Sequence, residues 1–126
     1  MRVLLDTRIL LWALIEPRRL RKEIVAQIRD PANELLFSAA SIAEIAIKVA
    51  QGRFDVAPER IVEAATNSGY AELPVASRHA ARLASMPMHH RDPFDRLLVA
   101  QALEEPARLL TVDRTLAPYS ELVMVV

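Results

Sequence analysis

Short apolar segments alternate with helical segments along this chain, and the alternation restricts the fold more than any other feature. The expected strands are residues 2–5, 34–38, 71–73, 108–112 and 121–126. The expected helices are residues 9–15, 18–30, 39–50, 58–67, about 77–84 and 93–102, with a turn or short helix at 115–119. No two-residue hairpin turn joins neighbouring strands. The pattern predicts an α/β fold, a three-layer sandwich in which about five parallel strands are covered by helices on both faces.

Composition sets further limits on the kind of protein. The 126 residues are expected to form one domain. Cysteine is absent, which excludes disulfides and thiolate metal sites and favours a reducing, cytoplasmic setting. Sixteen basic and sixteen acidic side chains cancel, which argues against a uniformly basic surface. Asp6 ends the first apolar run early and no run of about twenty apolar residues occurs, so we expect a soluble protein without a signal peptide or membrane span.

The stretch from His89 to Ala102 combines a helix start, two carboxylates and a strongly apolar helix. Asp92 before Pro93 is typical of an N-cap followed by proline at the first helical position, where the missing N–H costs nothing. Asp95 falls in the first turn, on roughly the same side of the helix as Asp92. The apolar residues that follow indicate a helix buried on most sides against the sheet.

Five acidic residues fall near one expected edge of the sheet. Asp6 follows the first strand and Asp113 follows the fourth. Glu44 lies in the helix after the second strand, and Asp92 and Asp95 open the helix before the fourth. Ligands of doubly wound folds bind beyond the carboxyl ends of the strands, so we expect a site at this edge.

Capping is the competing interpretation of these acids. Asp6, Asp92 and Asp113 could each cap a helix or turn, and Ser41 with Glu44 matches a capping box. Ser38 directly ends the second strand and is a competing N-cap for the same helix. If Ser38 is the cap, Glu44 has no backbone partner and can point into the crevice. The local sequence leaves both interpretations open.

Converging carboxylates favour a bound cation. Two carboxylates about 4 Å apart repel by roughly 4 kcal/mol at an effective dielectric near 20, and four together would force some to protonate. Oxygen ligands without cysteine or well-spaced histidine suit a hard divalent ion, Mg²⁺ or Mn²⁺. Such an ion can lower the pKa of a bound water and offset charge on a scissile phosphate, which indicates metal-dependent phosphodiester chemistry.

Other uses of these residues fit less well or stay open. A haloacid-dehalogenase-type phosphatase needs an aspartate two residues after Asp6, where this chain has Arg8. A receiver domain needs a lysine after a late strand, and the only lysines are Lys22 and Lys48. His89 and His90 could contact an RNA phosphate or shuttle a proton, and a role in a solvent-exposed loop is the favoured interpretation. Trp12 is either an interface anchor or part of the core.

Four segments together resemble the PIN-domain ribonucleases, specifically the VapC-type toxins of toxin–antitoxin pairs, over nearly the whole chain. The segments are residues 4–7 (LLDT) followed by Leu11 and Trp12, residues 38–48 (SAASIAEIAIK), residues 90–102 (HRDPFDRLLVAQA) and residues 110–113 (LTVD). The third is highly specific. The resemblance implies a single PIN domain over residues 1–126 and a PIN-like three-layer fold.

The resemblance also implies roles for individual residues. Asp6, Glu44, Asp95 and Asp113 match the family's catalytic, metal-binding acids, and Asp92 matches a frequent neighbour of that set. Thr7 and Thr111 are candidate hydroxyls that support these acids. Arg8, Arg91 and Arg96 are candidate RNA contacts. Many relatives carry histidine where this chain has Arg8, which is a departure from the pattern.

The implied activity is that of an endoribonuclease toxin in which a Mg²⁺- or Mn²⁺-activated water hydrolyses an RNA phosphodiester bond. The implied partners are the RNA substrate, a cognate antitoxin and a second copy of the chain in a homodimer. The alternative is a catalytically degenerate PIN-like domain that binds a protein partner without turnover. The RNA target has no readable motif, because shape and loop contacts would set specificity.

Overall fold

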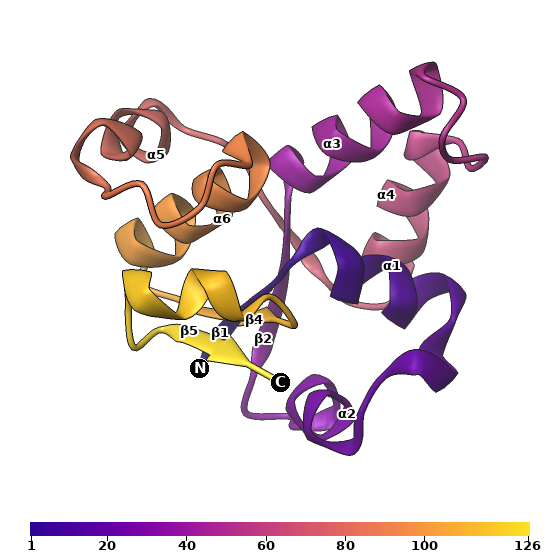
Figure 1. Cartoon of the computed structure of the whole chain (residues 1–126). Coiled ribbons are helices and arrows are strands. Elements are labelled where there is room, and N and C mark those ends of the chain that lie inside the picture. Colours follow the sequence, from indigo (N-terminus) through magenta and orange to yellow (C-terminus); the bar gives the residue numbers. More distant parts are fainter.

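The computed structural model describes all 126 residues and confirms the expected α/β architecture (Figure 1). Five parallel strands form one sheet in the order β3-β2-β1-β4-β5. The strands are β1 (Arg2–Leu5), β2 (Glu34–Ser38), β3 (Ala71–Leu73), β4 (Arg108–Thr111) and β5 (Val123–Val125). The α-helices are α1 (Thr7–Ile15), α2 (Lys22–Arg29), α3 (Ala39–Ala50), α4 (Pro58–Asn67), α5 (Ser77–Arg82) and α6 (Pro93–Glu104). Short 3₁₀ helices span Pro17–Arg19, Leu83–Ser85 and Arg114–Tyr119.

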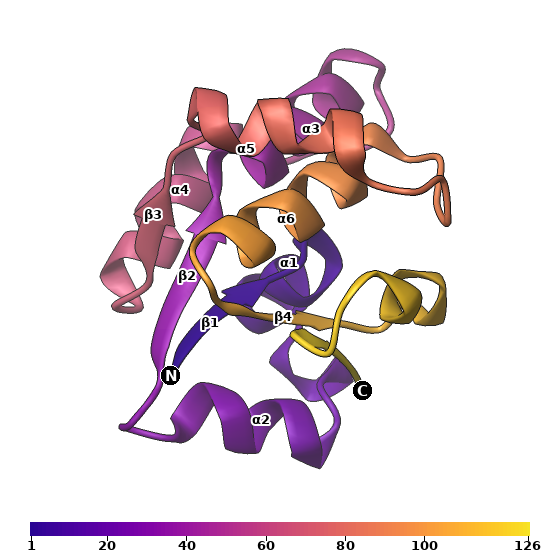
Figure 2. The same cartoon turned by 90° about the vertical axis from the view of Figure 1, so that its left-hand side faces the viewer.

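Alternating side chains of the strands build two separate cores, one on each face of the sheet. Leu4, Leu36 and Leu109 pack with the buried side of α6, whereas Val3 and Leu110 pack with α1, α3 and α4 on the other face. Figure 2 shows α5 and α6 together on the near side of the sheet. The three-layer sandwich therefore follows from strands that are apolar on both faces.

Several element boundaries differ from the expectation by one or two residues, and three differences are larger. The helix expected at residues 18–30 is divided, because Leu20 is extended (φ −76°, ψ 131°) after a 3₁₀ turn that begins at Pro17. α5 ends at Arg82 and continues as a 3₁₀ turn rather than as an α-helix to residue 84. The last strand covers only Val123–Val125. None of these changes moves the carboxyl edge of the sheet.

Trp12 is half-buried, and the guanidinium of Arg19 lies 4.9 Å from the centre of its ring. None of the helices is both long and apolar enough to cross a lipid bilayer.

An ion cluster around Glu105 holds the C-terminal end of α6, the end away from Asp92 and Asp95. Its carboxylate accepts hydrogen bonds from Nε2 of His79 at 2.6 Å, from Arg78 at 2.5 Å and from Arg2 at 3.1 Å. Nδ1 of His79 accepts from the backbone N–H of Ala76, so the ring proton is on Nε2. The His79 bond, followed by those from Arg2 and Arg78, lowers the pKa of Glu105 to about 2 despite the opposing effect of burial.

Replacing Glu105 by Gln is expected to reduce the free energy of unfolding by about 1 to 2 kcal/mol at pH 7, because charge-assisted hydrogen bonds become neutral ones. The folded-state pKa lies below the usual value of 4.5. The stabilisation is therefore present above about pH 4.5 and is lost as the pH falls toward 2. Urea denaturation at pH 7 and pH 3 measures both effects, with the exposed Glu121→Gln as control. An equal difference at the two pH values would contradict the assignment.

Candidate metal centre

The acidic residues from four separate segments line one pocket of about 240 Å³ at the carboxyl edge of the sheet. Every acid selected from the sequence is part of this lining. The lining residues are Asp6, Thr7, Arg8, Leu11, Glu44, Lys48, Asp92, Asp95, Val112 and Asp113. Five carboxylates thus face two cationic side chains, which leaves the pocket with an excess of negative charge.

Asp6 lies deepest in the pocket and is 6% exposed. It caps α1 by accepting a hydrogen bond from the backbone N–H of Ile9 at 2.7 Å. Its other oxygen accepts from the hydroxyl of Thr111 at 2.6 Å, and the Thr111 oxygen accepts from the N–H of Asp113. Burial raises the pKa of Asp6 in spite of these bonds. Thr111 therefore connects two acids of the pocket, as expected for a supporting hydroxyl.

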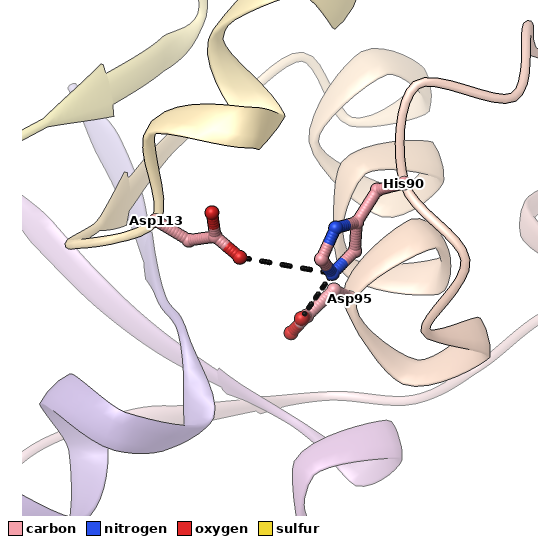
Figure 3. Close-up of side chains that lie close together, drawn as sticks. All are labelled: His90, Asp95 and Asp113. Carbon is pink, nitrogen blue, oxygen red and sulfur yellow. Dashed lines mark hydrogen bonds and ion pairs between the residues drawn. The ribbon is translucent and has the colours of Figure 1, made fainter.

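Asp95 and Asp113 meet across a histidine, as Figure 3 shows. Nε2 of His90 lies 2.9 Å from an oxygen of Asp95 and 3.7 Å from an oxygen of Asp113. Nδ1 of the same ring lies 2.9 Å from the hydroxyl of Thr115. The interpretation of His90 as a solvent-exposed loop residue is wrong, because its side chain is only 21% exposed and lies between two acids. His89 is exposed, as expected.

The pKa values of these two carboxyls move in opposite directions. Burial, followed by repulsion from Asp92, raises the pKa of Asp95 to about 6. At Asp113 burial also acts to raise the pKa, but hydrogen bonds from the backbone and hydroxyl of Thr115 outweigh it, so the pKa lies below the usual value. The groups around Asp95 therefore do not fully stabilise the negative charge of its carboxylate.

Glu44 points into the pocket because Ser38, not Ser41, caps α3. The Ser38 hydroxyl accepts from the N–H of Ala40 at 2.9 Å, which decides between the two caps. One oxygen of Glu44 accepts from Lys48 at 3.1 Å. Its other oxygen, Oε1, is buried and has no hydrogen-bond partner. A buried carboxylate oxygen without a partner is costly, and it is satisfied if a cation binds there.

The capping interpretation and the site interpretation both apply to the aspartates. Asp92 caps α6 by accepting from the N–H groups of Phe94 and Asp95, and Asp113 caps the 3₁₀ helix at Arg114–Tyr119. Capping fixes the carboxylate of each at the pocket wall while leaving other lone pairs free. Asp92 differs from the other acids because both of its hydrogen bonds serve the start of α6.

The remaining candidates occupy different positions. The hydroxyl of Thr7 donates to Ser41 at 2.9 Å, so it ties α1 to α3 rather than supporting a carboxylate. Arg8 is exposed at the pocket wall, and its charge acts to lower the pKa of Asp6 and Asp113. Arg91 is exposed beside the pocket. Arg96 is 8% exposed and donates to the carbonyls of residues 83 and 87, so its expected contact with RNA does not fit this position.

The donor set suits a hard divalent cation. Asp6, Glu44, Asp95 and Asp113 offer carboxylate oxygens, one of them without a partner. Ligand atoms of His90, Asp95 and Asp113 lie within 4.8 Å of one another. Mg²⁺ and Mn²⁺ prefer oxygen ligands and keep part of their water shell, which an open pocket permits.

Comparison with known proteins agrees with this geometry. Residues 3–122 match the model of the PIN domain family. The chain belongs to the PIN domain family. It is 34% identical to ribonuclease VapC22 of Mycobacterium tuberculosis over 90% of this chain and 88% of that protein. Membership in the PIN family confirms the resemblance inferred from the four sequence segments.

Solved structures support the same PIN fold. The crystal structure of VapBC2 from Rickettsia felis, bound to a DNA fragment from its promoter, matches with a TM-score of 0.72 and 14% identity over 100% of this chain and 98% of that chain. VapBC-1 from nontypeable Haemophilus influenzae matches with a TM-score of 0.58 and 21% identity over 87% of this chain and 85% of that chain. At these identities the likeness establishes the fold of the PIN domain.

Proposed function

We propose that this PIN domain, residues 1–126, is the endoribonuclease toxin of a toxin–antitoxin pair and hydrolyses RNA phosphodiester bonds with the help of Mg²⁺ or Mn²⁺. The observation that carries the proposal is the pocket in which Asp6, Glu44, Asp95 and Asp113 converge. The pocket lining has only two cationic side chains, too few to balance its carboxylates. The ribonuclease name of the relative from M. tuberculosis supports the same activity. Retention of all four acids argues against a degenerate binding module.

The chain's own residues would hold and orient the reacting groups. Asp6, Glu44, Asp95 and Asp113 are the proposed ligands of the ion. When bound, Mg²⁺ or Mn²⁺ lowers the pKa of a water and offsets charge on the scissile phosphate. Thr111 fixes the orientation of Asp6, and His90 fixes that of Asp95.

Arg8 is the cationic side chain best placed to meet the substrate at the pocket mouth. It is exposed, it lines the pocket, and it has no ion pair in the structure. A guanidinium there can donate two parallel hydrogen bonds to phosphate oxygens. We propose that Arg8 neutralises a phosphate oxygen as the RNA backbone enters among the acids.

A protein antitoxin is the proposed partner, supported by the VapBC assemblies among the structural neighbours. The antitoxin would control the ribonuclease by occupying the acidic pocket. A cytoplasmic location follows from the proposed RNA substrate. The homodimer that the family resemblance implies stays a prediction.

The test is cleavage of a labelled RNA of mixed sequence by the purified chain. We expect cleavage with Mn²⁺ or Mg²⁺, none in EDTA, and recovery when the metal is returned in excess. Because water is the proposed nucleophile, the reaction should tolerate a 2′-deoxy sugar at the cleaved bond and leave no 2′,3′-cyclic phosphate. Cleavage at an equal rate in EDTA, or products with a cyclic phosphate, would falsify the proposal.

A further inference from the structure

A second hollow adjoins the acidic pocket and has a different chemistry. Its volume is about 360 Å³, within the range of sites that hold small organic groups. It shares Glu44, Lys48 and Asp92 with the acidic pocket, so the two form one continuous depression. The new wall comes from the end of α3, the loop after it and the start of α6. Its further lining residues are Ile47, Gln51, Arg53, Arg91, Pro93 and Phe94.

Cationic side chains dominate the new wall of this groove. Arg53 and Arg91 are exposed, and neither forms an ion pair. The single side-chain hydrogen bond of Arg53 goes to the neutral amide of Gln51, and Arg91 has none. Asp92 is occupied as the cap of α6. Two free guanidiniums therefore lie directly beside a pocket that is itself strongly acidic.

The same groove exposes apolar surface between its charges. Ile47 is 46% exposed, so its aliphatic side chain is accessible from the groove. Phe94 is half-buried at the first turn of α6. Cations that can track a phosphate backbone, next to an aromatic ring and an aliphatic surface, are the combination by which proteins bind single-stranded nucleic acid. A duplex hides its bases in the stack and would leave the apolar surface unused.

We propose that this groove binds the stretch of single-stranded RNA next to the scissile bond. Lys48, Arg53 and Arg91 contact backbone phosphates, and one unstacked base lies against Phe94 and Ile47. Lys48 lines both hollows, so it meets the phosphate nearest the cut. The proposal rests on the proposed function for its substrate, but it concerns binding and can be tested without cleavage.

The experiment measures binding of a fluorescent 12-nucleotide single-stranded RNA in an Asp95→Asn background, which keeps the probe intact. Titrations in EDTA are repeated from about 50 to 300 mM salt. Arg53→Gln and Arg91→Gln should each raise the Kd about threefold to tenfold and reduce the slope of log Kd against log salt by about 0.7. The matched control is Arg29→Gln, an exposed arginine at the end of α2, which lies at the opposite end of the molecule from α3 (Figures 1 and 2), and it should change neither quantity.

A variant of the apolar surface separates stacking from charge. Phe94→Leu keeps the helix start apolar and should raise the Kd about tenfold without changing the salt slope, because stacking involves no counterion release. A duplex RNA of the same length should bind more weakly than the single strand. If both arginine variants bind the single strand like their parent at every salt concentration, the proposal is overturned, and the groove faces solvent or a protein partner instead.

The two proposals fail in distinguishable ways. RNA binding that depends on Arg53 and Arg91, in a wild-type chain that never cleaves RNA, would support the groove and contradict the ribonuclease assignment. The opposite outcome is metal-dependent cleavage by the wild type together with normal binding and cleavage by Arg53→Gln and Arg91→Gln. That outcome would support the ribonuclease assignment and contradict the proposal that the groove binds RNA.

Discussion

Replacing Asp95 by Asn should abolish RNA cleavage and, at the same time, raise the melting temperature of the metal-free protein at pH 7. Both effects have the same cause. Burial and the nearby charge of Asp92 raise the pKa of Asp95 to about 6, so its ionised form is disfavoured in the folded protein. Asparagine has the same shape, keeps an oxygen acceptor for His90 and carries no charge.

The sign and size of the stability effect follow from linkage. The folded-state pKa lies above the usual value of 3.8, so the folded protein binds the proton more tightly than the unfolded chain does. The contribution of Asp95 to stability therefore declines as the pH rises from about 4 to about 6. Partial exposure to solvent screens this charge, so we expect a gain of about 1 kcal/mol for Asp95→Asn at pH 7. For a chain of this size that is a rise of about 4 °C.

Thermal melts in EDTA at pH 7.5 and pH 4 measure the effect, and the advantage of the variant should shrink at pH 4. Adding Mn²⁺ should raise the melting temperature of the wild type and leave that of the variant almost unchanged. RNA cleavage by the variant should fall at least about a hundredfold, because a proposed ligand is lost. Asp30→Asn, in an exposed turn, is the control. Wild-type cleavage by Asp95→Asn would remove Asp95 from the catalytic set.

The fold could be predicted because the signals that define it are local. β1 (Arg2–Leu5) is apolar on both faces and is followed directly by Asp6, which caps α1, and β2 ends on Ser38, which caps α3. Strand-helix alternation then leaves few topologies, since parallel crossovers are right-handed. The same locality explains why the acids could be selected. In a parallel sheet a residue directly after a strand lies at the carboxyl edge.

The errors concern side chains whose partners are distant in sequence. His90 lies beside Asp113 and Thr115, and nothing near position 90 indicates that the loop before α6 crosses to the end of β4. Arg96 is one position from a proposed ligand in a motif rich in charge, which favoured a surface role. In the structure its guanidinium is buried against the chain that precedes its own helix, where it donates to the carbonyls of Pro87 and Leu83.

Replacing Arg96 by Met should destabilise the protein by about 2 to 3 kcal/mol. The substitution removes a buried guanidinium and leaves its neutral acceptors without a hydrogen-bond donor. One nitrogen of the guanidinium donates to the carbonyl of Pro87 at 3.1 Å and to the hydroxyl of Tyr119 at 3.2 Å. The other donates to the carbonyl of Leu83 at 3.3 Å. No carboxylate pairs with Arg96, so its role is to hold the chain between α5 and α6 in place.

Loosening of that segment should reach the site through His90. The carbonyl of His90 lies 3.5 Å from the same guanidinium, and its ring orients Asp95. We therefore expect amide hydrogen exchange across residues 86–91 to accelerate in Arg96→Met. RNA cleavage should fall about tenfold, which is the lower range for loss of a residue that orients a ligand. Arg96→Lys should be intermediate, because a single ammonium cannot reach carbonyls on two sides.

Urea denaturation and the salt dependence of RNA binding separate this role from a direct RNA contact. If Arg96 anchors the loop, Arg96→Met loses stability and keeps the salt slope of the parent, since no phosphate contact is removed. If Arg96 met a phosphate, the variant would keep its stability and its exchange rates while the slope fell by about 0.7. Each interpretation thus predicts a change in one measurement and no change in the other, and the burial of the guanidinium favours the first.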